Sequence, residues 1–315
     1  MLSERNAVNE ENKSDEKLGP TIWAVGGGKG GVGKSVISTL IGFWLSQMGK
    51  KTVLIDVDFG GANLHTMLGI KSPPRTVNDF VAKKYNRLED ICIETDIENL
   101  RLLSGASEIL SLANLQFAQK VKIMQSISQL ETEFAILDLG SGTSYNVLDF
   151  FLMAHHKIVV LTPQPISIQN AYAFVRNAVY RKLSRLSSQK PALLATIKTA
   201  MDPKNELNVR TMKDLLRAVQ ENNSEEDMNL LSQEIADIRP ALVTNMTKSQ
   251  RDQEAGRIIQ LVSEKYLMIH PTMLGSIMRD NQVDNMVSGM VPLTAIDRAS
   301  DAFAGVYNIV TDLLK

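Results

Sequence analysis

The residues with the clearest chemistry lie in one glycine-rich stretch, GGGKGGVGKS at residues 26–35. Residues 28–35 fit the phosphate-loop pattern GxxxxGK[ST]. Glycines let the backbone turn its N–H groups inward around a phosphate, and a following helix N-terminus adds partial positive charge. In this pattern Lys34 reaches the β- and γ-phosphates, and the Ser35 hydroxyl holds Mg²⁺. The stretch therefore predicts nucleoside triphosphate binding by Gly28, Lys29, Gly30, Gly31, Val32, Gly33, Lys34 and Ser35.

The flanks of this stretch decide between a phosphate loop and a simple turn, which is what most glycine clusters are. Residues 21–25 (TIWAV) have the pattern of a buried strand, and residues 35–48 have that of a helix. Strand, loop, lysine, serine and helix in this order are the context that the motif requires. We therefore favour the phosphate loop.

Two further apolar runs end in acidic residues. Residues 51–58 (KTVLIDVD) predict a strand that ends in Asp56 and Asp58. Continuous apolar runs are typical of parallel sheets covered on both faces, where ligands sit at the carboxyl ends of the strands. Two carboxylates beside a phosphate loop would repel each other, and a divalent cation is the simplest explanation for their presence. A solvated pair of strand-end acids is the alternative.

The second of these runs, residues 134–138 (FAILD), ends in Asp138 and precedes the flexible residues 139–143. This is the form of a Walker B strand with its switch loop, in which the acid holds Mg²⁺ through water. The pattern is common by itself. Its position after the phosphate loop and the first acid-ended strand supports the Walker B interpretation.

Composition narrows the class of protein. The chain has 315 residues, 44% of them hydrophobic, and a formal net charge of −1, so binding to nucleic acid or membrane would need a local patch. The single cysteine, Cys92, excludes a disulfide or a cysteine metal cluster within one chain and fits a reducing compartment. No signal sequence and no apolar run of membrane-spanning length is present. We expect a cytoplasmic protein.

The remaining organisation follows from hydrophobic periodicity. We expect a disordered N-terminal tail at residues 1–19, because it is polar and charged. Residues 20–315 are expected to form one domain with a largely helical insertion at about 187–237. Further strands are predicted at 90–93, 99–103, 157–162, 239–245, 266–269 and 273–277, and helices at 77–84, 108–130, 167–186, 249–264 and 294–314.

A basic run occupies the end of the helix predicted at 167–186. Arg176, Arg181, Lys182, Arg185 and Lys190 stand in a stretch, residues 176–190, that contains no acid. A solvated helix face is the favoured interpretation, and a site for an anionic partner is the other.

These motifs resemble a known family. Residues 29–35 (KGGVGKS), with a second lysine at the start of the loop, resemble the deviant Walker A motif of the MinD/ParA ATPases, and residues 54–64 (LIDVDFGGANL) resemble that family's second signature. Residues 137–142 (LDLGSG), 161–165 (LTPQP) and 170–173 (NAYA) are similar to flagellar-number regulators of the FlhG type (FleN, YlxH). The resemblance implies an α/β P-loop NTPase fold of the SIMIBI type, with three layers and a mostly parallel twisted sheet covered by helices on both faces.

The resemblance also implies residue roles. Lys29 would cross to the partner's phosphates in an ATP-bound homodimer, and Asp58 would orient the attacking water, which makes these two the catalytic residues. Ser35, Asp56 and Asp138 would hold Mg²⁺, and Asn245 would contact adenine. The implied function is a Mg-ATP-dependent dimerisation switch with slow ATP hydrolysis. Such a switch positions or counts flagellar or polar machinery, or marks a division site, and works with a protein partner or activator.

Departures from the family pattern leave other functions open. Met278 and Arg279 replace the usual proline-containing adenine loop before Asp280, and the C-terminus lacks a basic amphipathic extension, so we expect no membrane-targeting helix. A ParA-like partition ATPase that binds DNA is the main alternative, supported only by the basic run. A metabolic enzyme of the same superfamily, either a ligase or an iron–sulfur carrier, is a third. The absence of a CxxC motif argues against the carrier.

Overall fold

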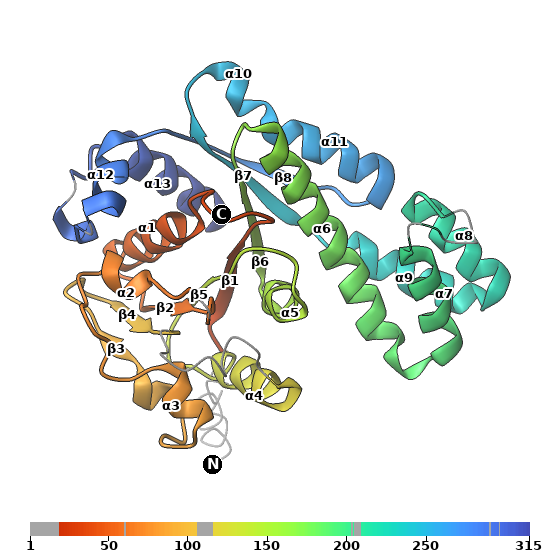
Figure 1. Cartoon of the computed structure of the whole chain (residues 1–315), viewed down its shortest axis with the longest axis horizontal. Helices are drawn as coiled ribbons and strands as arrows, with labels where there is room; N and C mark the ends of the chain where they lie inside the picture. The colour runs from red at the N-terminus through yellow and green to blue at the C-terminus, as the bar shows by residue number, and fades with distance from the viewer. Residues whose placement is uncertain are drawn as a thin grey trace, which may run out of the picture.

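A computed structural model describes residues 19–59, 61–105, 116–202, 204, 209–289, 291–295 and 297–315. These residues form an eight-stranded sheet in the order β3-β4-β2-β5-β1-β6-β7-β8, with helices on both faces (Figure 1). All neighbouring strands are parallel except β3 and β4. The predicted three-layer α/β architecture with a mostly parallel sheet is confirmed. Residues 1–18, where we expect a disordered tail, lie outside the described residues.

The strands are short and mostly buried. Their bounds are β1 Thr21–Gly26, β2 Thr52–Asp56, β3 Ile93–Glu94, β4 Leu100–Leu103, β5 Phe134–Asp138, β6 His156–Leu161, β7 Pro240–Thr247 and β8 Thr272–Met278. In β1, Ile22 and Ala24 pack into the core on one face of the sheet, and Trp23 and Val25 pack into the core on the other. This two-sided burial explains why the strands have continuous apolar sequences.

The helices divide between the two cores. Helices α1 (Lys34–Gln47), α2 (Leu64–Met67), α12 (Asn281–Gly289) and α13 (Asp301–Leu313) cover one face. The other face carries α3 (Val77–Val81), α4 (Phe117–Ile127), α5 (Tyr145–Met153), α6 (Pro165–Leu186), α7 (Pro191–Met201), α8 (Met212–Asn222), α9 (Glu225–Ala236) and α11 (Ala255–Leu267). The short helix α10 (Gln250–Gln253) precedes α11. Within the described ranges, no helix is long and apolar enough to cross a membrane.

The predicted strand at 266–269 is wrong. Residues 266 and 267 complete α11, because Leu267 continues the buried stripe of Ile259 and Ser263 at a spacing of four residues. Met268 then ends the helix with a left-handed φ of 56°. The short apolar run Tyr266–Ile269 therefore forms the end of a helix and the start of its connection to β8.

Several element boundaries also differ from the prediction. The strand expected at 90–93 is mostly a 3₁₀ turn, Glu89–Ile91, and β3 begins only at residue 93. The described part of the helix expected at 108–130 is α4, and residues 106–115 lie outside the described residues. The last helix starts at residue 301 instead of 294, because the Ser300 hydroxyl caps it by accepting a hydrogen bond from the Phe303 N–H at 3.5 Å. Helices α2, α5 and α12 were not predicted.

Candidate functional site

The predicted phosphate loop connects the carboxyl end of β1 to the N-terminus of α1. Gly31 and Gly33 have φ angles of 76° and 91°, a backbone region that favours glycine. Gly28 is required for a different reason. A Cβ atom at this position would lie 2.0 Å from the Asn170 carbonyl oxygen of α6, so only glycine fits against that helix. The loop conformation therefore depends on its glycines.

The two lysines of the loop have different environments. Lys34 is 8% exposed, and its Nζ lies 3.5 Å from the Lys29 carbonyl oxygen. Burial lowers the pKa of the Lys34 ammonium, while the charges of Asp138 and Asp58 act in the opposite direction. The Lys29 side chain is half-buried, and no described residue forms an ion pair or hydrogen bond with its ammonium. Lys34 is thus held inside the site, whereas Lys29 is left available to a group from outside.

Asp56 and Asp138 lie side by side at the ends of two adjacent parallel strands, β2 and β5, where they form a registered pair. Their exposed fractions are 1% and 2%. Burial and then the neighbouring Asp138 charge raise the pKa of Asp56 to about 8. Burial raises the pKa of Asp138 to about 6, although hydrogen bonds from Ser35 and Ser38 act against this. Lys34 is the cation that acts on this buried acid pair, and its charge lowers the pKa of Asp138 without cancelling the effect of burial.

The carboxylate of Asp56 also organises the loop that follows β2. Its Oδ1 accepts a hydrogen bond from the Asp58 N–H at 3.1 Å. Its Oδ2 accepts from the N–H groups of Asn63 at 2.9 Å and Leu64 at 3.2 Å. These bonds fix the backbone that carries Asp58. Sequence reasoning missed this anchoring role, because it depends on where the chain returns after the loop.

Ser38 is a second site residue that sequence reasoning missed. Its hydroxyl donates a hydrogen bond to Asp138 Oδ1 at 2.8 Å. It lies one helical turn after Lys34 and is fully buried in α1. Its spacing of four residues from Lys34, which places both side chains on one helix face, was the available signal.

The Asp58 carboxylate lies over the switch loop that follows β5. A Cβ atom placed on Gly140 would be 3.1 Å from the Asp58 carboxylate carbon and Oδ1. The Asp58 side chain is half-buried and close enough to Lys34 for their charges to interact. The structure therefore brings Lys34, Asp56, Asp58 and Asp138 together at one edge of the sheet.

Asn245, near the carboxyl end of β7, reaches the phosphate loop. Its Nδ2 donates a hydrogen bond to the Val32 carbonyl oxygen at 2.9 Å, and the residue is 7% exposed. No described residue donates a hydrogen bond to its Oδ1. Asn245 therefore braces the loop, and its carbonyl oxygen is the part of the amide left for a ligand.

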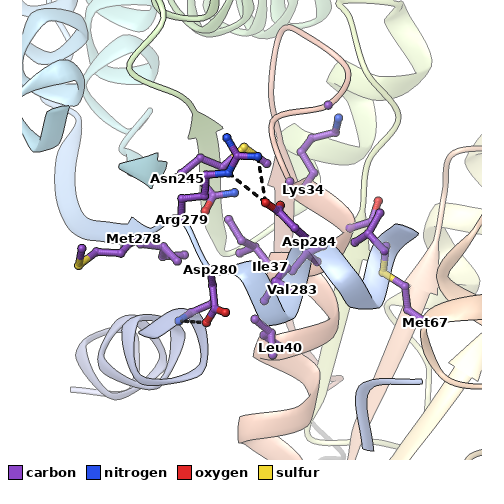
Figure 2. Close-up of a pocket in the computed structure, with 18 of the residues that line it drawn as sticks. Lys34, Ile37, Leu40, Met67, Asn245, Met278, Arg279, Asp280, Val283 and Asp284 are labelled. Atoms are coloured by element: carbon purple, nitrogen blue, oxygen red, sulfur yellow. Dashed lines mark hydrogen bonds and ion pairs between the residues drawn. The ribbon is translucent and has the colours of Figure 1, made fainter. Parts of the chain in front are cut away.

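A cavity of about 460 Å³ extends from the loop along α1 (Figure 2). The phosphate loop and the start of α1 contribute Gly33, Lys34 and Ser35 to its lining, and the β8–α12 connection contributes Met278, Arg279 and Asp280. Apolar side chains form much of the wall between them, including Ile37, Leu40, Met67, Val283 and Val287. A concave site with a polar end and an apolar body suits a nucleotide.

The residues present fit a phosphate ligand and a hard divalent cation. Backbone N–H groups at a helix N-terminus and a buried ammonium suit phosphate. Ser35, Asp56 and Asp138 offer oxygen donors, which Mg²⁺ prefers, and a cation would relieve the repulsion within the buried acid pair. Within the described ranges, no group of three or more His, Cys, Asp and Glu side chains could hold a metal ion. Mg²⁺ sites at substrate phosphates typically use only one or two carboxylates.

Most cations of the basic run at 176–190 form ion pairs within the chain. Arg181 donates to both carboxylate oxygens of Asp149 at 2.8 Å, and Arg185 lies 3.5 Å from the same carboxylate. Lys182 pairs with Glu234 at 2.7 Å, and Lys190 pairs with Asp227 at 2.5 Å. Four of the five cations of the run therefore take part in intramolecular ion pairs, which weakens the sequence support for the DNA-binding alternative.

Comparisons with known proteins agree with this site. A ParA family model, described as "NUBPL iron-transfer P-loop NTPase", matches residues 20–183, just over half of the chain. The chain is 31% identical over 157 residues to the antiactivator FleN of Pseudomonas aeruginosa. This alignment covers 49% of this chain and 55% of FleN. It is 30% identical over 178 residues to the flagellum site-determining protein YlxH of Helicobacter pylori. This second alignment covers 54% of this chain and 58% of YlxH. The chain thus spans little more than half the length of these relatives.

Solved structures share the fold. The septum site-determining protein MinD from Pyrococcus horikoshii, complexed with Mg-ADP, superposes with a TM-score of 0.63 at 17% identity and covers 94% of this chain and 96% of that one. The family match covers residues 20–183, which hold the phosphate loop and both acid-ended strands. These findings show that the chain belongs to the ParA/MinD family of P-loop NTPases.

Proposed function

We propose that this protein is a Mg-ATP-dependent dimerisation switch that hydrolyses ATP slowly and regulates the position or number of a cellular structure. We propose that this structure is flagellar or polar machinery, or the division site. The printed names of its relatives, an antiactivator and a flagellum site-determining protein, support the regulatory class. A switch driven by ATP acts in the cytoplasm, where the nucleotide is supplied.

The observation that carries this proposal is the contrast between the two lysines of the loop. Lys34 is buried at the helix N-terminus, whereas the Lys29 ammonium has no partner among the described residues. A cation displayed next to a phosphate site and unused by its own chain suits a second subunit's nucleotide. Charge stabilisation supplied from another subunit ties hydrolysis to association, as an arginine finger does.

The proposed chemistry assigns each group one task. Water attacks the γ-phosphorus, and the bond from that phosphorus to the β–γ bridging oxygen breaks, giving ADP and phosphate. Asp58 orients the water, and Lys34 with the partner's Lys29 stabilises the negative charge on the phosphoryl oxygens. Ser35, Asp56 and Asp138 would hold Mg²⁺, which supplies charge neutralisation at the phosphates. Loss of the γ-phosphate weakens the bridge between the subunits.

The helices α7, α8 and α9 fit the proposed role of an insertion in one nucleotide-binding domain. They pack on one another and beside α6, apart from the nucleotide site (Figure 1). We propose that residues 187–237 bind a protein partner or activator of the switch. The third alternative, an iron–sulfur carrier with a CxxC motif, conflicts with the presence of a single cysteine in the sequence.

The test is light scattering of the protein with ADP, with ATP and with a slowly hydrolysed ATP analogue. The wild type should dimerise with ATP and the analogue and remain monomeric with ADP. Lys29→Ala should keep nucleotide binding, measured by calorimetry, and lose the dimer. Lys71→Ala, which removes an exposed lysine, is the matched control and should dimerise like the wild type. A dimer that persists in Lys29→Ala would refute the cross-subunit role.

A further inference from the structure

A second cavity, of about 320 Å³, lies on the far half of α6, where this helix leads into the insertion (Figure 1). It is lined by residues of α5 and α6, namely Leu152, Lys182, Arg185 and Leu186. The insertion reaches the same place, because Glu234 of α9 pairs with Lys182 at 2.7 Å. The phosphate loop meets α6 at Asn170, and the distance along the helix from there to Arg185 is about 22 Å. The cavity is therefore separate from the nucleotide site.

One carboxylate beside this cavity is shared by three cations. Asp149 accepts hydrogen bonds from Arg181, at 2.8 Å to each oxygen, and from Lys120. The Arg185 Nη1 lies 3.5 Å from Asp149 Oδ1, and the Arg185 side chain is 49% exposed. Among the described residues, none accepts a hydrogen bond from the Arg185 guanidinium. A guanidinium carries five N–H donors, so those of Arg185 are left for a group from outside the chain.

A further cation lies close to Lys182. The Lys157 ammonium donates to the Ala154 carbonyl oxygen after α5, and no acid in the described ranges forms an ion pair with it. Burial, and then the Lys182 charge, lowers the pKa of Lys157. Glu234 pairs with Lys182 alone. Positive charge therefore exceeds negative charge around the cavity, and an incoming anion would reduce the repulsion.

The lining favours a carboxylate on an apolar segment over other anions. Leu152 and Leu186 form the apolar part of the wall, and a free phosphate would bury no apolar surface against them. A guanidinium such as that of Arg185 binds a carboxylate through two parallel N–H···O bonds. Nucleic acid requires several cations that contact successive phosphates, whereas Lys182 and Arg181 are mostly buried and already paired.

We propose that this cavity, at the root of the insertion, binds an acidic side chain of the partner protein, with Arg185 as the residue that pairs with its carboxylate. An apolar neighbour of that acid in the partner packs on Leu152 and Leu186. The inference deepens the proposed function and rests on it, because it names the chemistry of the partner that docks beside residues 187–237. It places the partner on the opposite face of the sheet from α1, so a partner can bind while the nucleotide site is filled.

The experiment uses the full chain and four probes, with binding followed by NMR of the backbone amides of α5 and α6. The probes are a capped Leu-Glu-Leu tripeptide, its Leu-Gln-Leu counterpart, inorganic phosphate and a short DNA duplex. The Leu-Glu-Leu peptide should bind with a Kd of about 1 mM, and the Leu-Gln-Leu peptide at least about 10-fold more weakly. Arg185→Gln should weaken the Leu-Glu-Leu peptide by at least about 10-fold, because the charge-assisted hydrogen bonds are lost.

Arg176→Gln is the matched control, since Arg176 is an exposed arginine of the same basic run that does not line the cavity. It should bind the Leu-Glu-Leu peptide like the wild type. Urea unfolding of Arg185→Gln checks that the variant is folded, and we expect a wild-type midpoint because the side chain is half-exposed.

Three results would overturn the proposal: equal binding of the two peptides, phosphate binding as tight as that of Leu-Glu-Leu, or unchanged peptide affinity in Arg185→Gln. DNA binding that is lost in Arg185→Gln would also overturn it, in favour of a nucleic-acid site. The outcome is distinct from that of the proposed function, because the titrations contain no nucleotide. A chain that binds the peptide but forms no ATP-dependent dimer would refute the switch and leave this site in place.

Discussion

The Asn245 side chain holds the phosphate loop through a residue 213 positions earlier in the chain, by a hydrogen bond to the Val32 carbonyl oxygen. The two residues lie far apart in the sequence, and the sheet brings them together across the carboxyl ends of β1, β6 and β7. The acceptor residue, Val32, directly precedes Gly33, which has a left-handed φ and is the N-cap residue of α1. The geometry of the loop therefore depends on β7 as well as on its own glycines.

Gly33→Ala should abolish nucleotide binding with a smaller effect on folding. A Cβ atom at Gly33 would lie 2.2 Å from the Asn245 Nδ2, and φ there is 91°. Gly49→Ala is the matched control, because Gly49 also has a positive φ, 76°, but has open space around a Cβ atom. Both variants should lose stability by roughly 1 kcal/mol from backbone strain, measured by urea unfolding. ATP binding by Gly33→Ala at wild-type affinity would contradict the role assigned to the Asn245 brace.

Lys34→Ala should weaken ATP binding by about 10- to 100-fold, the size expected for loss of a charge-assisted hydrogen bond to phosphate. Calorimetry at fixed Mg²⁺ measures the change. Lys50→Ala, which breaks an exposed pair with Glu133, serves as the control and should bind ATP normally. Unchanged affinity in Lys34→Ala would refute the phosphate-loop assignment.

Asp58→Ala should bind ATP and dimerise, yet hydrolyse ATP at least about 100-fold more slowly, in the range typical for loss of a group that positions or activates water. Single-turnover phosphate release measures the rate. Wild-type turnover in this variant would show that another group orients the water.

Gly140→Ala tests the proposed role of Asp58 by displacing its carboxylate. The added methyl group would press on the Asp58 carboxylate at 3.1 Å, and the flexible side chain would have to move. We expect slower hydrolysis, by about 10-fold, with ATP affinity unchanged. The comparison is Gly142→Ala, which adds a methyl group to the same loop where nothing lies within 4 Å, although φ there is 91°. Equal losses in both variants would indicate loop strain instead of displacement of Asp58.

Asp149→Asn should destabilise the protein by about 3 kcal/mol at pH 7, because it leaves the buried Lys120 ammonium and the partly buried Arg181 guanidinium without their carboxylate. The Asp149 side chain is 3% exposed and contacts Lys120, Arg181 and Arg185. Burial acts to raise the pKa of Asp149, but the hydrogen bonds from Arg181 and Lys120 outweigh it, so the pKa lies below its usual value.

The sign of the pH dependence follows from that lowered pKa. An acid whose pKa is lower in the folded state contributes stability above its unfolded pKa, about 3.9, and loses it as pH falls through the folded pKa. The difference between wild type and Asp149→Asn in urea unfolding should therefore be constant above about pH 5 and shrink below pH 4. Asp312→Asn, which breaks the exposed pair with Lys315, should change stability by less than about 1 kcal/mol at all pH values. A difference that grows on acidification would contradict this account.

The sequence by itself determined the elements whose signals are local. The phosphate loop, its flanking strand and helix, and the acid-ended strands β2 and β5 could all be predicted, because continuous apolar runs and glycine-rich turns depend on neighbours along the chain. The run at residues 266–269 was misassigned for the same reason. Four apolar residues look alike in a strand and in the last turn of a helix such as α11.

Only the tertiary structure decided which of these residues meet. Strand order places Asp56 against Asp138, and their shared burial changes their pKa values, which no local pattern encodes. The acidic partners of the basic run, Asp149, Glu234 and Asp227, lie outside it in sequence, so these ion pairs could not be predicted from the run itself. Long-range pairing depends on topology, and topology depends on how the helices and strands pack together.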